Sequence, residues 1–139
     1  MTGTTTPYGF GVTVPLVYEA AVQRTRDALA AEGFGVLTEI DVAATLKKKL
    51  GVDRSPYVIL GACNPPLAHR ALELEPDIGL LLPCNVVVYS SERPGWTTVT
   101  ALDPEAALRL TGRADIAPLA AEVKGRLRRV IEAVERPTP

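Results

Sequence analysis

The side chains best suited to chemistry, two thiols and one imidazole, lie within residues 63–84. The thiols belong to Cys63 and Cys84, and the only histidine, His69, falls between them. Three chemistries are open to these groups. The thiols can form a reversible disulfide if their Cα atoms lie within about 7 Å, they can bind a soft metal with His69 as a third ligand, or one thiolate can act as a nucleophile.

Each of these chemistries has a simpler structural alternative. Buried free cysteine is a common small core residue, and the spacing of Cys63 and Cys84 forms no C-x-x-C motif. A lone surface histidine also accounts for His69. The sequence contains no P-loop, no dinucleotide-binding glycine motif and no Ser-His-Asp pattern. It therefore predicts neither a particular reaction nor a particular cofactor.

The elements expected around this stretch determine where its groups lie. The apolar run Tyr57–Ala62 predicts a central strand, and Asn64 followed by two prolines predicts the start of a helix. Cys63 then lies just before the N-cap, where the positive end of the helix dipole favours a thiolate. Leu80–Ser90 predicts a further strand, interrupted by Pro83. If these two strands are neighbours, the cysteines can approach each other.

The rest of the chain predicts an α+β domain. Its order is β-α-β-α-β-α-β-β-α, with about five strands in a mixed or antiparallel sheet and helices mainly on one face. We interpret Gly9 and Gly11, in the first strand, as positions of close backbone approach. The expected organisation is a flexible N-terminus over residues 1–7, a single domain over 8–135 and a tail over 136–139.

Composition excludes several classes of function. The chain has 139 residues, 47% of them apolar, and a net charge of -1, which is typical of a globular domain and argues against a nucleic-acid partner. The apolar runs are too short to span a membrane, and the N-terminus does not resemble a signal peptide. We therefore expect a cytoplasmic protein with reduced thiols. An exposed edge strand needs protection, so we expect a homodimer.

Polar groups at the expected strand ends are candidates for recognising a small ligand. Asn64 and Asn85 serve either as structural caps or as ligand contacts, and Lys48 lies either on a solvated helix end or against an anion. A cleft lined by acids, thiols and amides would form if these strand ends meet. The candidate ligand-binding residues are Asp41, Lys48, Cys63, Asn64, Cys84 and Asn85. A metal site of Cys63, Cys84 and His69 is the alternative.

Several segments resemble the domain of unknown function 302 family. They are Phe34–Asp41 with Lys48 and Gly51, Tyr57–Pro65 and Leu81–Val86, within a resemblance that extends from Tyr8 to Val134. The resemblance implies a compact α+β domain that tends to dimerise, and it implies no established activity. It directs attention to Asp41, Lys48, Cys63, Asn64, Pro65, Pro83 and Cys84, but not to His69.

Taken together, these features predict a small cytoplasmic homodimer that binds a small ligand or a protein partner near Cys63 and Cys84. The alternative is a thiol redox or metal-handling protein that uses the same two cysteines.

Overall fold

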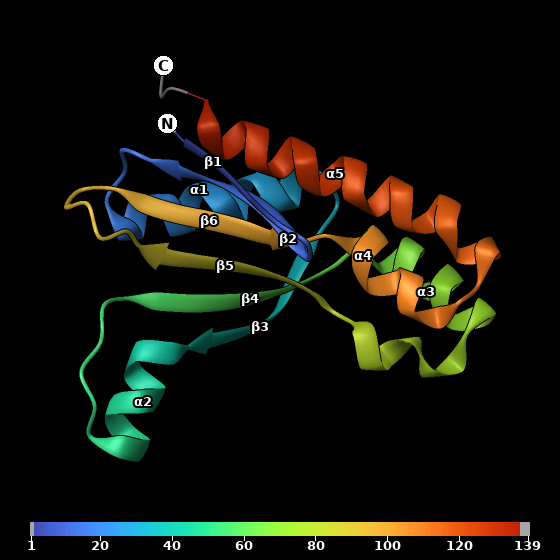
Figure 1. Cartoon of the computed structure of the whole chain (residues 1–139), viewed down its shortest axis with the longest axis horizontal. Helices are drawn as coiled ribbons and strands as arrows, with labels where there is room; N and C mark the ends of the chain where they lie inside the picture. Colours follow the sequence, from blue (N-terminus) through green and yellow to red (C-terminus); the bar gives the residue numbers. More distant parts are fainter. Residues whose placement is uncertain (1, 137–139) are drawn as a thin grey trace.

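A six-stranded antiparallel sheet forms the centre of the computed structural model, which describes residues 2–136 (Figure 1). The strands lie in the order β1-β2-β6-β5-β4-β3, and each neighbouring pair is antiparallel. Their bounds are β1 Thr2–Thr6, β2 Gly9–Val14, β3 Gly35–Asp41, β4 Tyr57–Cys63, β5 Cys84–Ser90 and β6 Thr97–Leu102.

The described part of the chain also contains five α-helices and three short 3-10 helices. Helices α1, α2, α3 and η1 lie between strands, and the other four follow β6. The α-helices are α1 Tyr18–Ala31, α2 Val42–Leu50, α3 Pro65–Leu74, α4 Pro104–Leu108 and α5 Ala117–Glu135. The 3-10 helices are η1 Pro76–Leu81, η2 Arg109–Thr111 and η3 Ala114–Ile116. None of the helices within residues 2–136 combines the length and apolar character needed to cross a bilayer.

The predicted α+β class and the antiparallel β5–β6 pair are confirmed, but the expected count of about five strands is one too low. The extra strand is β1, in a segment for which the sequence predicted no regular structure. Its threonines suit a pleated strand, and pairing along β2 gives their backbone groups partners. Pro83 precedes β5, so the interrupted strand predicted over Leu80–Ser90 begins only at Cys84. The expectations for residue 1 and for residues 137–139 lie outside the described residues.

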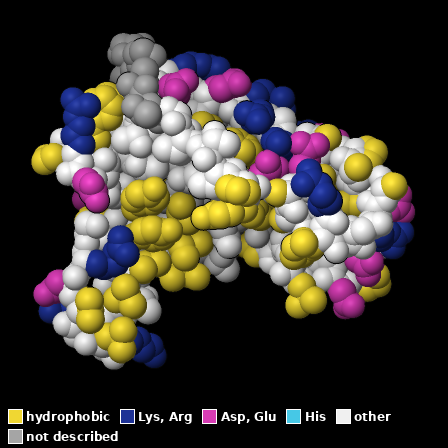
Figure 2. Space-filling model, viewed as in Figure 1, with side chains coloured by type: hydrophobic (Ala, Val, Ile, Leu, Met, Phe, Trp, Pro, Cys, Tyr) yellow, Lys and Arg dark blue, Asp and Glu magenta, His cyan; other side chains and the backbone are white. Residues whose placement is uncertain are grey.

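Helices α1 and α5 pack side by side on one face of the sheet and enclose the core. Alternate strand residues such as Leu60, Val86 and Val99 point toward them and are fully buried with Leu29 and Leu127. The intervening residues lie on the opposite face, which we call the open face. Figure 2 shows apolar side chains gathered over this face in the centre of the view. Helices α1 and α5 therefore leave the open face uncovered in the described chain, and this face is a large apolar surface.

Strand β2 approaches β6 unusually closely at two glycines. A Cβ atom on Gly11 would lie 2.1 Å from the carbonyl oxygen of Val99, and one on Gly9 would lie 2.9 Å from that of Ala101. Side chains larger than hydrogen do not fit at these positions, so the interpretation of both glycines is confirmed. The close approach brings the turn between β1 and β2 toward the open face (Figure 1).

Candidate functional site

An apolar cavity of about 340 Å³ lies where β4 and β5 meet helices α3, α4 and α5. Three of the six candidate residues line it, namely Cys63, Asn64 and Cys84. Most of the remaining wall is aliphatic or aromatic, and it includes Phe34, Leu37, Leu67, Leu72, Leu82, Leu108, Leu119 and Val123. No charged side chain is among the lining residues. The cavity therefore suits apolar atoms, with one amide and two thiols as its polar groups.

Asn64 fixes the start of α3 at the edge of the cavity. Its Oδ1 accepts a hydrogen bond from the backbone N–H of Leu67 at 3.3 Å, as the sequence predicted for an N-cap. Its Nδ2 lies against Gly33, since a Cβ atom there would be 3.0 Å away. Gly33 has a φ of 83°, a conformation that favours glycine. Asn64 thus positions α3 against the end of α1.

Cys84 is a buried wall residue with a protonated thiol. It pairs with Ala62 across β4 and β5, and only 7% of its surface is exposed. Burial, with a smaller contribution from Cys63, raises its pKa to about 11. A thiol with so high a pKa is a poor nucleophile near neutral pH. Cys84 therefore contributes packing and a weakly polar surface.

Cys63 is partly exposed and is not the cross-strand partner of Cys84. The strands of the two cysteines are neighbours, as expected, but Cys63 lies one residue beyond the partner of Cys84. This offset keeps the two side chains from lying directly opposite each other, although both line the cavity. Both cysteines are free. The expectation that their side chains approach each other is wrong, because it ignored this one-residue offset in register.

His69 does not join the cysteines in a metal site. Its Nε2 lies 3.1 Å from Oε1 of Glu73, one turn along α3, and both side chains are largely exposed. His69 is not among the residues that line the cavity. Within residues 2–136, no group of three or more histidine, cysteine or acidic residues is placed to hold a metal ion. The geometry thus gives the alternative metal site no support.

The other three candidate residues lie elsewhere. Asp41 caps α2, where its Oδ1 accepts the N–H of Ala44 at 2.9 Å, and Lys48 is exposed on the same helix. Gly35, at the opposite end of the seven-residue β3, is the partner of Cys63, so Asp41 lies roughly 20 Å from the cavity end of the strand. Asn85 is exposed on the open face. These groups do not share one cleft with the thiols.

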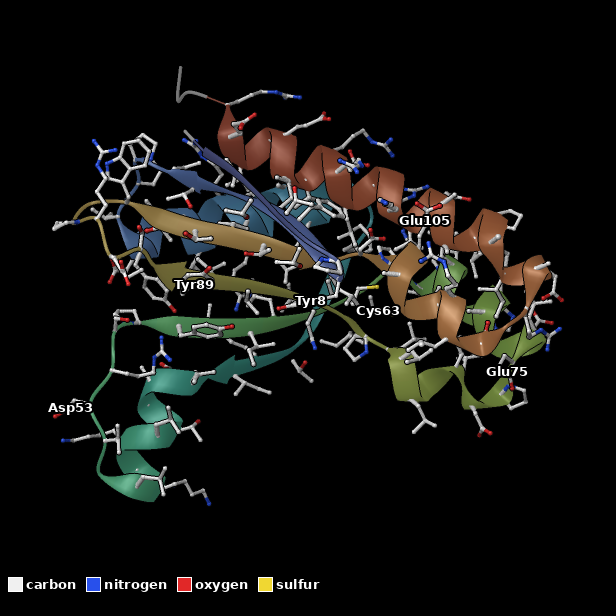
Figure 3. The ribbon with its side chains drawn as sticks, in the orientation of Figure 1. Tyr8, Asp53, Cys63, Glu75, Tyr89 and Glu105 are labelled. Atoms are coloured by element: carbon white, nitrogen blue, oxygen red, sulfur yellow. The ribbon has the colours of Figure 1, made fainter. Side chains whose placement is uncertain are left out.

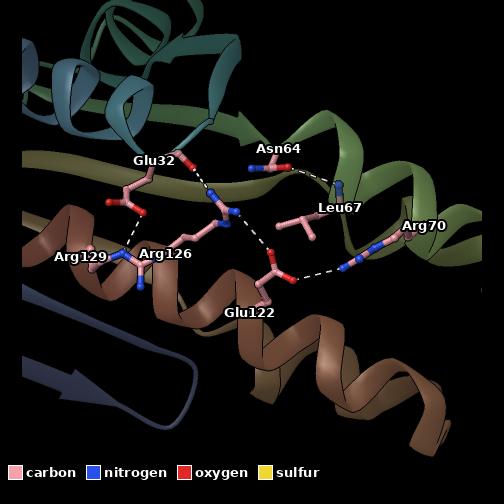
Figure 4. Close-up of polar contacts among 7 residues, drawn as sticks. All are labelled: Glu32, Asn64, Leu67, Arg70, Glu122, Arg126 and Arg129. Carbon is pink, nitrogen blue, oxygen red and sulfur yellow. Dashed lines mark hydrogen bonds and ion pairs between the residues drawn. The ribbon is translucent and has the colours of Figure 1, made fainter.

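Charged residues hold together the helices around the cavity (Figure 4). Arg126 of α5 donates to the backbone oxygen of Glu32 at 2.9 Å and pairs with Glu122 at 3.3 Å. Glu122 also pairs with Arg70 of α3, and Arg129 pairs with the carboxylate of Glu32. This network connects α5 to α3 and to the end of α1.

The helical spacing of apolar residues in the sequence predicts that Leu67, Leu119 and Val123 lie on buried helix faces, but it does not identify them as cavity walls. Their spacing shows which face of a helix is apolar, and this part of the prediction is correct. Whether facing helices leave a gap depends on the packing of separate elements. We know of no local pattern in this sequence that would have revealed the cavity.

An antiparallel sheet covered on one face by helices, with a cavity where strands and helices meet, defines a small α+β domain. Residues 10–134 match the family described as Domain of unknown function DUF302, and the chain belongs to that family. A similar solved protein is the uncharacterized conserved protein DUF302 from Bacillus stearothermophilus, with 30% sequence identity and a TM-score of 0.84. The match covers 91% of this chain and 98% of that chain. No curated protein matches the chain.

Proposed function

We propose that this domain binds a small, uncharged, apolar molecule in the cavity lined by Cys63, Asn64 and Cys84. The observation that carries the proposal is a cavity of about 340 Å³ whose lining contains no charged residue. Small-molecule sites are mostly apolar and have volumes of roughly 300–1,000 Å³. A charged ligand would lose its hydration here and gain no ionic partner, which is costly.

Binding accounts for the geometry better than thiol chemistry does. The thiol of Cys84 is buried, its raised pKa of about 11 keeps it protonated near neutral pH, and Cys63 is not its cross-strand partner. We further propose a cytoplasmic location, where two free thiols stay reduced.

The cavity can be tested by placing a charge in its wall. Leu72 lines the cavity and is 45% exposed, so an aspartate there keeps access to water and the fold is retained. Leu110 is 78% exposed and does not line the cavity, which makes Leu110→Asp the matched control. We expect octan-1-ol to shift the amide NMR signals of the cavity wall in the wild type and in Leu110→Asp, with at least tenfold weaker binding to Leu72→Asp. Absence of binding to the wild type, or equal binding to all three proteins, contradicts the proposal.

We also propose that the chain forms a homodimer through β1, one of the two edge strands. The other edge strand, β3, has an irregular register between Val36 and Thr38 and carries Glu39, features that discourage pairing with another chain. In contrast, β1 is uncharged and its register with β2 is regular. Antiparallel pairing of β1 with β1 of a second copy would satisfy its outer backbone groups.

A lysine on β1 tests this interface. Thr5 is exposed, and Thr5→Lys places a charge on the edge, where charges oppose strand pairing. Ala44→Lys adds the same charge on the exposed surface of α2 and serves as the control. Light scattering is expected to give twice the chain mass of 14.8 kDa for the wild type and the control, and the monomer mass for Thr5→Lys. A monomeric wild type excludes the homodimer, and a dimeric Thr5→Lys variant excludes this interface.

A further inference from the structure

A second hollow, of about 310 Å³, lies on the open face of the sheet and is separate from the cavity at Cys63. Its lining includes three tyrosines and three uncharged polar residues, namely Tyr8, Tyr57, Tyr89, Thr6, Asn85 and Thr100, and the rest of it is glycine or aliphatic. Figure 3 shows Tyr8 and Tyr89 on the side of the sheet that faces the viewer. We call this feature the tyrosine hollow.

Aromatic rings form one side of the tyrosine hollow. Tyr57 and Tyr89 are directly opposite each other on β4 and β5, and their rings stack with centroids 5.2 Å apart and planes inclined by 8°. Tyr8 lies in the turn between β1 and β2 and is 67% exposed. Tyr8 is followed directly by Gly9, which also lines the hollow. The hollow therefore presents phenol rings from two separate parts of the chain.

Free polar groups complete the hollow. Asn85 is exposed on β5 and Thr100 is partly exposed on β6, and within residues 2–136 neither side chain has a hydrogen-bond partner. An asparagine amide offers one acceptor and two donors. No charged side chain lines the hollow, and the nearby guanidinium of Arg54 lies over the Tyr57 ring, 5.0 Å from its centroid. A ligand that uses these groups is therefore neutral and carries hydrogen-bonding atoms at its edge.

We propose that the tyrosine hollow binds a neutral, planar heteroaromatic ring of nucleobase size. The face of such a ring stacks on tyrosine regardless of its exact substitution, while Asn85 pairs with a neighbouring donor and acceptor at the ring edge, as asparagine does with adenine. The uncharged lining disfavours a phosphate-rich polymer, which binds through basic side chains. A second copy or an apolar peptide would cover the face without needing the free amide of Asn85.

Adenosine is a suitable probe, with cyclohexanol as a non-planar comparison. We expect adenosine to shift the ring-proton NMR signals of Tyr57 and Tyr89 in a saturable manner, and cyclohexanol to leave them unchanged. Asn85→Ala and Tyr89→Leu are each expected to weaken adenosine binding at least tenfold. Gln23→Ala, on the exposed side of α1 away from the open face, should bind as the wild type does. Thermal melts establish that each variant is folded.

Three results overturn the proposal. They are absence of adenosine binding to the wild type at millimolar concentration, unchanged binding by both hollow variants, and a dimer that excludes adenosine and dissociates on Asn85→Arg substitution. The last result would show that a second copy covers the open face. Leu72→Asp changes only the cavity at Cys63, so it should bind adenosine normally. The proposal for the cavity and the proposal for the tyrosine hollow can therefore fail independently of each other.

Discussion

Cys63 and Cys84 line the same cavity but are not cross-strand partners, although their strands are paired. The register of β4 and β5 aligns Cys84 with the residue before Cys63. Cys63 is partly exposed, whereas Cys84 is buried. The same local environment that shields Cys84 also holds its thiol in the protonated form.

This difference in exposure predicts selective alkylation. Iodoacetamide at pH 8 should modify Cys63 in the native protein and leave Cys84 unmodified, because Cys63 is accessible to the reagent, whereas Cys84 is buried and its raised pKa keeps its thiol protonated. Peptide mapping by mass spectrometry measures both sites. As a control, Cys63→Ala should take up no label when native and one label after unfolding in urea. Equal labelling of the two cysteines in the native wild type would contradict the burial of Cys84.

The raised pKa of Cys84 predicts a loss of stability at high pH. Below pH 9 its thiol is protonated in both the folded and the unfolded chain. As the pH rises from the usual pKa of 9.0 to the folded value of about 11, the unfolded chain releases its proton first, so folding becomes less favourable. The loss over this window is about 2–3 kcal/mol.

Urea unfolding at several pH values measures this loss. Cys84→Ala is less stable than the wild type at neutral pH because it leaves a cavity, so the slope with pH is compared rather than the absolute free energy of unfolding. The slope between pH 9 and 11 should be shallower in the variant, since tyrosine and lysine titrations are shared by both proteins. Parallel slopes would rule out burial of a titrating Cys84.

The elements around the site were predictable because their signals are local. Asn64 before two prolines indicated the start of α3, and the apolar run from Tyr57 indicated β4. Strand β1 was missed because its small polar residues resemble a chain end, and its pairing with β2 is a tertiary preference. Local propensity also could not show that every strand pair is antiparallel.

The candidate site was predictable only in part, because strand direction decides which chain ends meet. Asp41 ends β3 and Cys63 ends β4, which suggested that they lie together. In an antiparallel pair the end of one strand meets the start of the other, and Asp41 accordingly pairs with Val58. Cys63 and Asn64 are neighbours in sequence, so their proximity did not depend on whether the strands are parallel or antiparallel.

The two candidate asparagines should differ in their contribution to stability. Asn64→Ala removes the cap of α3 and is expected to lower the free energy of unfolding by about 1–2 kcal/mol. Asn85→Ala is expected to change it by less than about 0.5 kcal/mol, because its exposed side chain makes no hydrogen bond within residues 2–136. Urea unfolding of both variants makes the comparison. Similar losses for the two variants would refute the assignment of different roles.

Two glycine-to-alanine substitutions should change stability in opposite directions. Gly11→Ala drives a methyl group to within 2.1 Å of the oxygen of Val99, so β2 must move away from β6. The expected loss is about 3 kcal/mol, at the upper end of the usual cost of overpacking.

Gly125 lies within α5, and its nearest contact is the flexible end of Arg129 at 3.8 Å. Gly125→Ala should therefore stabilise the protein by about 0.5–1 kcal/mol through helix propensity. Thermal and urea unfolding report both changes. A fully stable Gly11→Ala variant would contradict the close approach of β2 and β6.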